Sequence, residues 1–188
     1  MRKLSLILLL TLAGCASVPH GQSGASLSER AAAPFNLNGR LAVHHLDQRY
    51  AGGLRWQHRM QRDELLLQGP LGITAARVVS DAHSASLEQN GKRYQADDVE
   101  SLMQQVLGWG LPLPVLHHWL LGEADAASPA DIERDALGRI AVLHQSGWEV
   151  RYLRYAGDRA DSLPARITLS HEDLQVQLLI DEWEWNPQ

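Results

Sequence analysis

In the stretch Phe35-Asn36-Leu37-Asn38-Gly39-Arg40-Leu41-Ala42-Val43, apolar side chains alternate with polar ones. Successive side chains of a strand point to opposite faces, so the alternation predicts a β-strand with one buried face. The residues on that face are Phe35, Leu37, Leu41 and Val43.

A second strand follows across Asp47-Gln48-Arg49 and continues the same period. Tyr50, Leu54 and Trp56 lie on its buried face. Gly52-Gly53 inside it predicts a bulge or bend, because glycine in a strand commonly marks one. The two segments together predict an antiparallel hairpin.

Two further hairpins are expected before any helix. Residues 64–68 and 73–80 pair around Gly69-Pro70-Leu71-Gly72, and residues 85–89 and 92–95 pair around Asn90-Gly91. Asn-Gly between alternating segments is the strongest short-range hairpin signal. The first half of the chain is therefore expected to hold six antiparallel strands.

The period then changes to that of a helix over residues 99–107, with Asp97 as its N-cap, Glu100 in a capping-box arrangement and Gly108 as its stop. A second, short helix is expected from Pro114 to a stop at Gly122. Residues 123–131 read as a polar loop. Strands resume at 139–145, 147–155, 165–170 and 174–185, so the plan is ten or eleven antiparallel strands with a helical insertion.

The N-terminus has the pattern of a secretory signal, and the chain is expected to be exported. Arg2 and Lys3 precede an apolar run that ends in Leu12-Ala13-Gly14-Cys15, and this run is too short to span a bilayer as a helix. It resembles a bacterial lipoprotein signal, which implies cleavage after residue 14 and acylation of Cys15. The expected organisation is a signal peptide at 1–14, Cys15 and a flexible tether at 15–34, and one domain at 35–188.

Composition excludes several classes of function. The 17 Lys and Arg less the two in the signal leave 15, against 22 acidic residues, so the mature chain carries a formal charge of −7. This balance argues against a nucleic-acid partner and against electrostatic docking on anionic lipid. Since Cys15 is the sole cysteine, the fold is expected to rest on packing without disulfides.

Catalytic and metal-binding patterns are not found in the sequence. The histidines include the adjacent pairs His44-His45 and His117-His118, without the convergent spacing of a zinc site. Gly21-Gln22-Ser23-Gly24 lacks the strand and helix that a nucleophile elbow requires. We therefore expect no enzyme activity, no metal and no cofactor.

In its order of motifs the chain resembles the LolB family of outer-membrane lipoprotein receptors. The motifs are Phe35-x-Leu37-x-Gly39-Arg40-Leu41-Ala42-Val43, Gly53-x-x-Trp56, Leu65 to Gln68 followed by Gly69-Pro70-Leu71-Gly72, Tyr94-x-Ala96-Asp97-Asp98, Leu111-Pro112-Leu113-Pro114 with Trp119-Leu120-Leu121-Gly122, Gly147-Trp148-x-Val150-x-Tyr152 and Leu163-Pro164. The resemblance implies a curved, incompletely closed antiparallel β-barrel with an α-helical lid over an apolar cavity. Residues expected to line cavity and lid are Leu54, Trp56, Leu102, Val106, Trp119 and Trp148. The alternative is that the helices simply fill the barrel as ordinary core.

Leu71 occupies a hairpin tip, where Gly, Asn, Asp and Pro are preferred. From the residues alone, the simpler interpretation is that its side chain folds back onto the core. The resemblance implies instead a protruding loop whose leucine delivers cargo into the membrane, with Leu71 at the matching position.

The resemblance implies a monomeric acceptor, anchored by acylated Cys15 on the periplasmic face of the Gram-negative outer membrane. It would take cargo lipoproteins from a LolA-like periplasmic carrier, hold their acyl chains in the cavity and insert them into the outer membrane. Two alternatives stay open: a lipoprotein that binds lipid or another small apolar ligand, and a structural lipoprotein of an envelope assembly. Transfer of cargo from a loaded carrier would separate the three.

Overall fold

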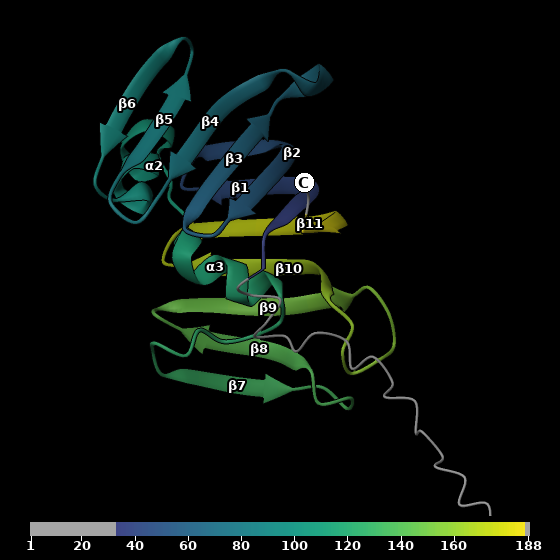
Figure 1. Cartoon of the computed structure of the whole chain (residues 1–188). Helices are drawn as coiled ribbons and strands as arrows, with labels where there is room; N and C mark the ends of the chain where they lie inside the picture. The colour runs from purple at the N-terminus through teal and green to yellow at the C-terminus, as the bar shows by residue number, and fades with distance from the viewer. Residues whose placement is uncertain (1–32, 187–188) are drawn as a thin grey trace, which may run out of the picture.

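The computed structural model describes residues 33–186 (Figure 1). The predicted signal peptide, Cys15 and the tether up to residue 32 lie outside the described residues. The strands are β1 Phe35–His45, β2 Gln48–Arg59, β3 Arg62–Gln68, β4 Thr74–Ser80, β5 Ala85–Gln89, β6 Lys92–Ala96, β7 Ala130–Arg134, β8 Ile140–Gln145, β9 Trp148–Tyr155, β10 Pro164–His171 and β11 Leu174–Trp185. The helices are α2 Val99–Leu107 and α3 Leu113–Leu120, and a 3-10 turn, η1, spans Pro70–Gly72.

All eleven strands belong to one antiparallel sheet in the order β6-β5-β4-β3-β2-β1-β11-β10-β9-β8-β7. The first and last strands pair in its middle, with Phe35 opposite Trp185 and His45 opposite Leu174. The sheet curls but does not close, since β6 and β7 are its two edges. In Figure 1 these edges lie at the upper left and the bottom, with α3 drawn between the two halves. The expected mainly β, incompletely closed barrel with a helical insertion is confirmed.

The six expected strands before the helices are present. In the Asn90-Gly91 turn, φ is 53° at Asn90 and 73° at Gly91, and such a two-residue turn requires this left-handed backbone at both positions. The expected bulge at Gly52-Gly53 is wrong, because β2 pairs with β1 there without a register shift. The glycine makes room instead: a Cβ at Gly52 would overlap the backbone oxygen of Gln68. The Tyr50 hydroxyl donates to that same oxygen at 3.0 Å.

The expected loop over residues 123–131 is wrong at its end, because β7 begins at Ala130. This strand lies at the sheet edge, where only Ile132 is partly buried and its neighbours are exposed. A strand with almost no buried side chains lacks the apolar alternation by which the other strands are recognised. The apolar pattern of the sequence therefore does not predict β7.

Helix α2 has the expected bounds, but its N-cap and the first residue of α3 each lie one residue away from the expected position. The N-cap of α2 is Asp98, not Asp97, since the Asp98 carboxylate accepts from the Ser101 amide at 2.7 Å. The expected stop at Gly108 is confirmed by its left-handed φ of 82°. Helix α3 begins at Leu113, with Pro114 in its first turn. Over residues 33–186, no helix has the length and apolar character needed to cross a membrane.

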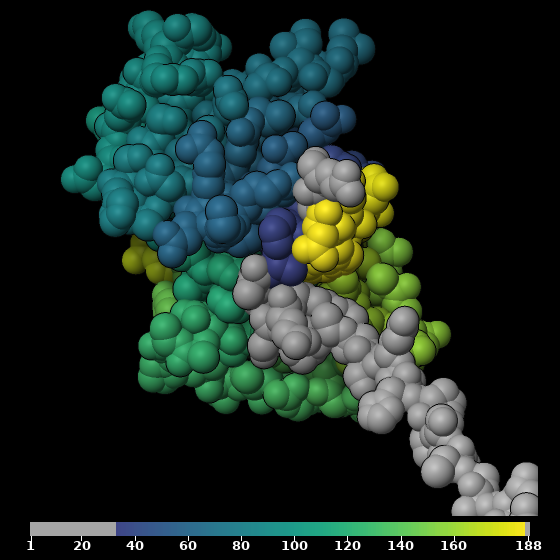
Figure 2. Space-filling model, viewed as in Figure 1, coloured from purple at the N-terminus to yellow at the C-terminus, as the bar shows by residue number. Residues whose placement is uncertain are grey.

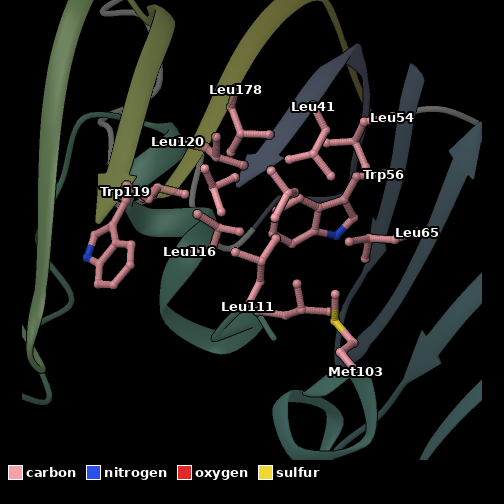
Figure 3. Packing of buried hydrophobic residues seen from close by; sticks show 14 of the residues in the cluster. Leu41, Leu54, Trp56, Leu65, Met103, Leu111, Leu116, Trp119, Leu120 and Leu178 are labelled. Carbon is pink, nitrogen blue, oxygen red and sulfur yellow. The ribbon is translucent and has the colours of Figure 1, made fainter. Parts of the chain in front are cut away.

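The apolar core lies on the concave face of the sheet. Helix α2 packs against β4, β5 and β6 and buries Val99, Leu102 and Met103. Helix α3 lies over the centre, where Leu116 and Leu120 belong to the same cluster as Leu41, Trp56 and Leu178 of the sheet (Figure 3). The fold therefore places one short helix directly on the inner face of a curved sheet.

Candidate functional site

The apolar face of α3 is completely covered. Leu113, Leu116, Trp119 and Leu120 are all at most 1% exposed, and Leu111 in the preceding linker is 2% exposed. Figure 3 shows the side chains of Leu111 and Leu116 among those of Trp56, Leu41 and Leu54. With α3 in this position, its own side chains occupy the inner face of the barrel.

The structure gathers the six residues expected to line the cavity. Leu54, Trp56, Leu102, Trp119 and Trp148 are buried members of one cluster, and Val106 packs against it, partly buried. They come from β2, α2, α3 and β9, elements far apart in the chain. Their role toward acyl chains stays a prediction, as does the choice between a lid and a permanent core helix.

A hollow of about 210 Å³ opens beside the linker between the two helices. Its wall includes Tyr50, Leu67, Leu107 and Trp109. The rings of Tyr50 and Trp109 lie 6.4 Å apart. No sequence pattern marks Trp109 as a site residue, because it lies between two glycines in a linker and outside any periodic segment.

The two helices are held in different ways. Helix α2 has a side-chain N-cap and a left-handed glycine at its end. Helix α3 has Pro112 at its N-cap position, with no side-chain cap hydrogen bond. A helix of eight residues is unstable on its own in water, so α3 depends on side chains of the sheet.

Two hydrogen bonds join the end of α3 to β8 and β9. The Trp119 indole Nε1 donates to Gln145 Oε1 at 2.9 Å, and the Tyr152 hydroxyl donates to the Trp119 backbone oxygen at 2.8 Å. Gln145 is 2% exposed and its amide donates to the backbone oxygens of Asp125 and Ser128. These buried polar groups are satisfied, which fixes the end of α3 and the loop that follows it.

Histidines join α3 to β2 on the other side. The His58 ring stacks on His117 with centroids 5.4 Å apart, and His117 lies 4.0 Å from His118. Burial, followed by the neighbouring His118 and His58, lowers the pKa of His117 to about 4. Burial also lowers the pKa of His118, against the opposing effect of the Asp125 carboxylate.

These histidines do not form a metal site. Across residues 33–186 there is no group of three or more His, Cys, Asp or Glu side chains arranged to hold a metal ion. The Asp98 carboxylate, close in sequence to Asp97 and Glu100, acts as a helix cap. The described part of the chain thus offers an apolar interior and a histidine contact, and its arrangement suits binding of apolar groups.

Leu71 lies at the β3–β4 tip, which projects from the body of the molecule at the upper right of Figure 2. Its side chain is 97% exposed and the neighbouring Ile73 is 68% exposed. The interpretation in which Leu71 folds back onto the core is therefore wrong. Leu71 also has a left-handed backbone, with φ 61° and ψ 18°, which is uncommon for a residue with a branched side chain.

Comparison with known proteins gives a consistent family. A family model described as "Outer membrane lipoprotein LolB" matches residues 33–183. The outer-membrane lipoprotein LolB of Chromobacterium violaceum is 37% identical over 183 residues, which cover 97% of this chain and 98% of that protein. The LolB of Thiobacillus denitrificans is 36% identical over 191 residues and covers 100% of both chains.

One solved structure shares the fold at very low sequence identity. A DUF1329 family protein from Desulfovibrio piger superposes with a TM-score of 0.53 at 3% identity, covering 85% of this chain and 89% of that one. A LolA superfamily protein from Nitrosomonas europaea superposes with a TM-score of 0.48 at 9% identity, covering 86% and 93%. At such identities, the former likeness concerns the fold alone.

Proposed function

Because the chain belongs to the LolB family of outer-membrane lipoproteins, we propose that it accepts lipoproteins from a LolA-like periplasmic carrier and inserts them into the outer membrane. It is a lipid-anchored protein of the Gram-negative outer membrane, and its role there is that of a lipoprotein receptor. The anchor would be acylated Cys15. The proposed activity is transfer between binding sites, without a chemical step.

The observation that carries the proposal is that α3 packs on the apolar, concave face of the sheet. Moving this one helix would uncover Trp56, Leu41 and Leu178 without breaking any strand pairing of the sheet. Acyl chains could then replace the side chains of Leu111, Leu116 and Leu120. An apolar surface with few polar groups suits such a ligand.

Entry of the acyl chains would take place beside the linker between α2 and α3. The hollow there is bordered by Leu107, Trp109 and Tyr50, and it lies next to the seat of the helices. As the chains advance they would meet the expected lining residues. These are Leu54, Trp56, Leu102, Val106, Trp119 and Trp148.

Delivery would take place at Leu71. The free energy falls when an exposed leucine at a projecting tip moves from water into the apolar part of a lipid interface. By entering it, the tip would bring the receptor against the bilayer and disturb the lipid packing locally. Because the same side chain makes no core contact in the structure, this role can be tested without damaging the fold.

The test is a transfer assay with liposomes that carry the acylated protein. A carrier loaded with a fluorescent lipoprotein is added, and cargo bound to the receptor is measured separately from cargo inserted in the bilayer. For Leu71→Glu we expect unchanged acceptance and a fall in insertion of about tenfold or more, because a charged tip resists transfer into an apolar phase.

Met60→Glu is the matched control. Met60 is 81% exposed with φ 50°, and it lies in the turn between β2 and β3, at the opposite end of β3 from Leu71. Its substitution should leave both steps unchanged. Equal insertion by the two variants would remove the role of Leu71. Failure of the wild-type protein to take cargo from the carrier would instead favour a ligand-binding or structural lipoprotein.

A further inference from the structure

Three histidine rings lie between β2 and α3, and the proposed transfer of acyl chains does not use them. We call His58, His117 and His118 the histidine stack. His58 comes from β2 and is 6% exposed, with its other face stacked on Phe35 at 5.2 Å. His117 and His118 belong to the last turn of α3. The stack therefore joins the helix to the sheet through titratable groups.

The charges around the stack are distributed unevenly. On the sheet side, Asp63 Oδ1 receives the Trp56 indole at 2.6 Å and His58 Nδ1 at 2.8 Å. Because an ionised carboxylate only accepts hydrogen bonds, the Nδ1 of His58 must carry its proton. The Arg59 guanidinium lies nearby and donates to the His58 backbone oxygen.

On the helix side, His118 Nε2 lies 3.9 Å from Asp125 Oδ1. A proton on His118 would thus face a carboxylate. His117 lies between two other histidines. The carboxylate that attracts a proton on His117 is that of Asp63, and its Oδ1 already accepts hydrogen bonds from Trp56 and His58. The Leu113 backbone oxygen and the end of the helix favour a positive charge on His117, but burial and the two histidines outweigh them.

Resting on the proposed receptor function, we propose that His117 makes the seated position of α3 dependent on pH. A proton on the His117 ring places a positive charge between His58 and His118, where it is disfavoured. Uptake of this proton displaces α3 from the barrel and uncovers the apolar inner face for acyl chains. The bond that fixes Trp119 to Gln145 is independent of protonation, so release begins at the side of the helix that faces β2.

The direction of the effect follows from proton linkage. In the seated helix the pKa of His117 is about 4, and in a displaced, hydrated helix it returns to about 6.5. Between these values the displaced state binds more protons, so the seated state loses stability as the pH falls through 6.5. These two values predict a rise in the displaced population of about tenfold or more between pH 7 and pH 5.

The experiment measures backbone amide hydrogen exchange in α3 of the full protein in liposomes, without cargo. Exchange rates of residues 116–120 are divided by the intrinsic rates at each pH, which gives the fraction of time that the helix is displaced. We expect this fraction to rise about tenfold from pH 7 to pH 5 in the wild-type protein. His117→Phe, which keeps a ring in the stack but cannot titrate, should remove most of the rise and leave the smaller part that the burial of His118 contributes.

His117→Gln is a second variant without a titrating group at this position, in case the phenylalanine repacks the helix, and it should show the same reduced rise. His83→Gln is the matched control, because His83 lies exposed in the turn between β4 and β5, and it should keep the wild-type slope. A flat profile in the wild-type protein, or a wild-type slope in both His117 variants, would overturn the proposal. Since no cargo is present, failure of the receptor function would show only in the transfer assay.

Discussion

Leu116 on α3 and Leu71 at the β3–β4 tip are the same residue type in opposite surroundings. Leu116 is 1% exposed and packs within the main cluster, whereas Leu71 is 97% exposed. Burial explains Leu116, since a covered leucine side chain contributes about 1.5–3 kcal/mol to folding. Folding does not explain Leu71, because the left-handed backbone costs a residue with a Cβ about 1–2 kcal/mol and the exposed side chain recovers none of it.

The comparison teaches that stability and transfer depend on different leucines. In the interior, a substitution should change the free energy of unfolding first and transfer only through it. At the tip, a substitution should change insertion and leave the free energy of unfolding almost unchanged. Substitutions in the two regions can therefore show whether the separation is real.

The largest effect on stability is expected for Leu116→Ala. Removing most of a buried leucine side chain should lower the free energy of unfolding by about 2–5 kcal/mol, because the tightly packed surroundings cannot fill the space. Urea unfolding measures it. Leu153→Ala, at a β9 position that is 52% exposed, is the control and should cost less than about 0.5 kcal/mol. A cost below about 1 kcal/mol for Leu116→Ala would mean that α3 spends much of its time displaced.

A smaller effect is expected for Tyr152→Phe. This removes the hydrogen bond from the hydroxyl to the Trp119 backbone oxygen at 2.8 Å while leaving the ring in place. The loss should be about 1 kcal/mol, the usual net contribution of one hydrogen bond, because the Trp119 oxygen loses this partner but keeps its bond from the Gly122 amide at 3.0 Å. Tyr94→Phe, where the side chain is 38% exposed, should be nearly neutral. Equal stability of the two variants would show that this bond does not hold α3.

The interior was largely predictable from the sequence, because buried faces of strands and helices require apolar residues at regular intervals. Alternation located β1 and β2, and helical spacing located α2. The same reason explains the error at β7, an edge strand in which only Ile132 is partly buried. The sequence predicted Asp97 as the N-cap of α2, whereas the structure has Asp98. Two adjacent aspartates have equal N-cap propensity, and only the backbone shows which one reaches the Ser101 amide.

The site was less predictable than the fold. The sequence can place Trp56 and Trp119 on buried faces, but contacts between strands and helices far apart in the chain decide that they share one cluster. The stack of His58 on His117 spans 59 residues of sequence and has no local pattern. The exposure of Leu71 likewise follows from the projection of its hairpin beyond its neighbours, which a turn motif does not specify.

The smallest effect on stability, and the sharpest test of the comparison, is expected for Leu71→Gly. Glycine adopts φ 61° without strain, which favours the variant by about 1–2 kcal/mol, but it loses about 0.5–1 kcal/mol more backbone entropy on folding. The net change should lie between zero and about 1.5 kcal/mol in favour of the folded state, with the middle of this range below about 1 kcal/mol.

Met60→Gly should respond in the same way, since Met60 has φ 50° and is 81% exposed. Thermal unfolding compares the two stabilities, and the liposome assay compares insertion. If the tip exists for delivery, Leu71→Gly unfolds no more easily than the wild type yet inserts cargo poorly, whereas Met60→Gly inserts it normally. A clear loss of stability in Leu71→Gly would mean that this leucine contributes to folding. Equal insertion by both variants would mean that an apolar side chain at this tip is not what delivers the cargo.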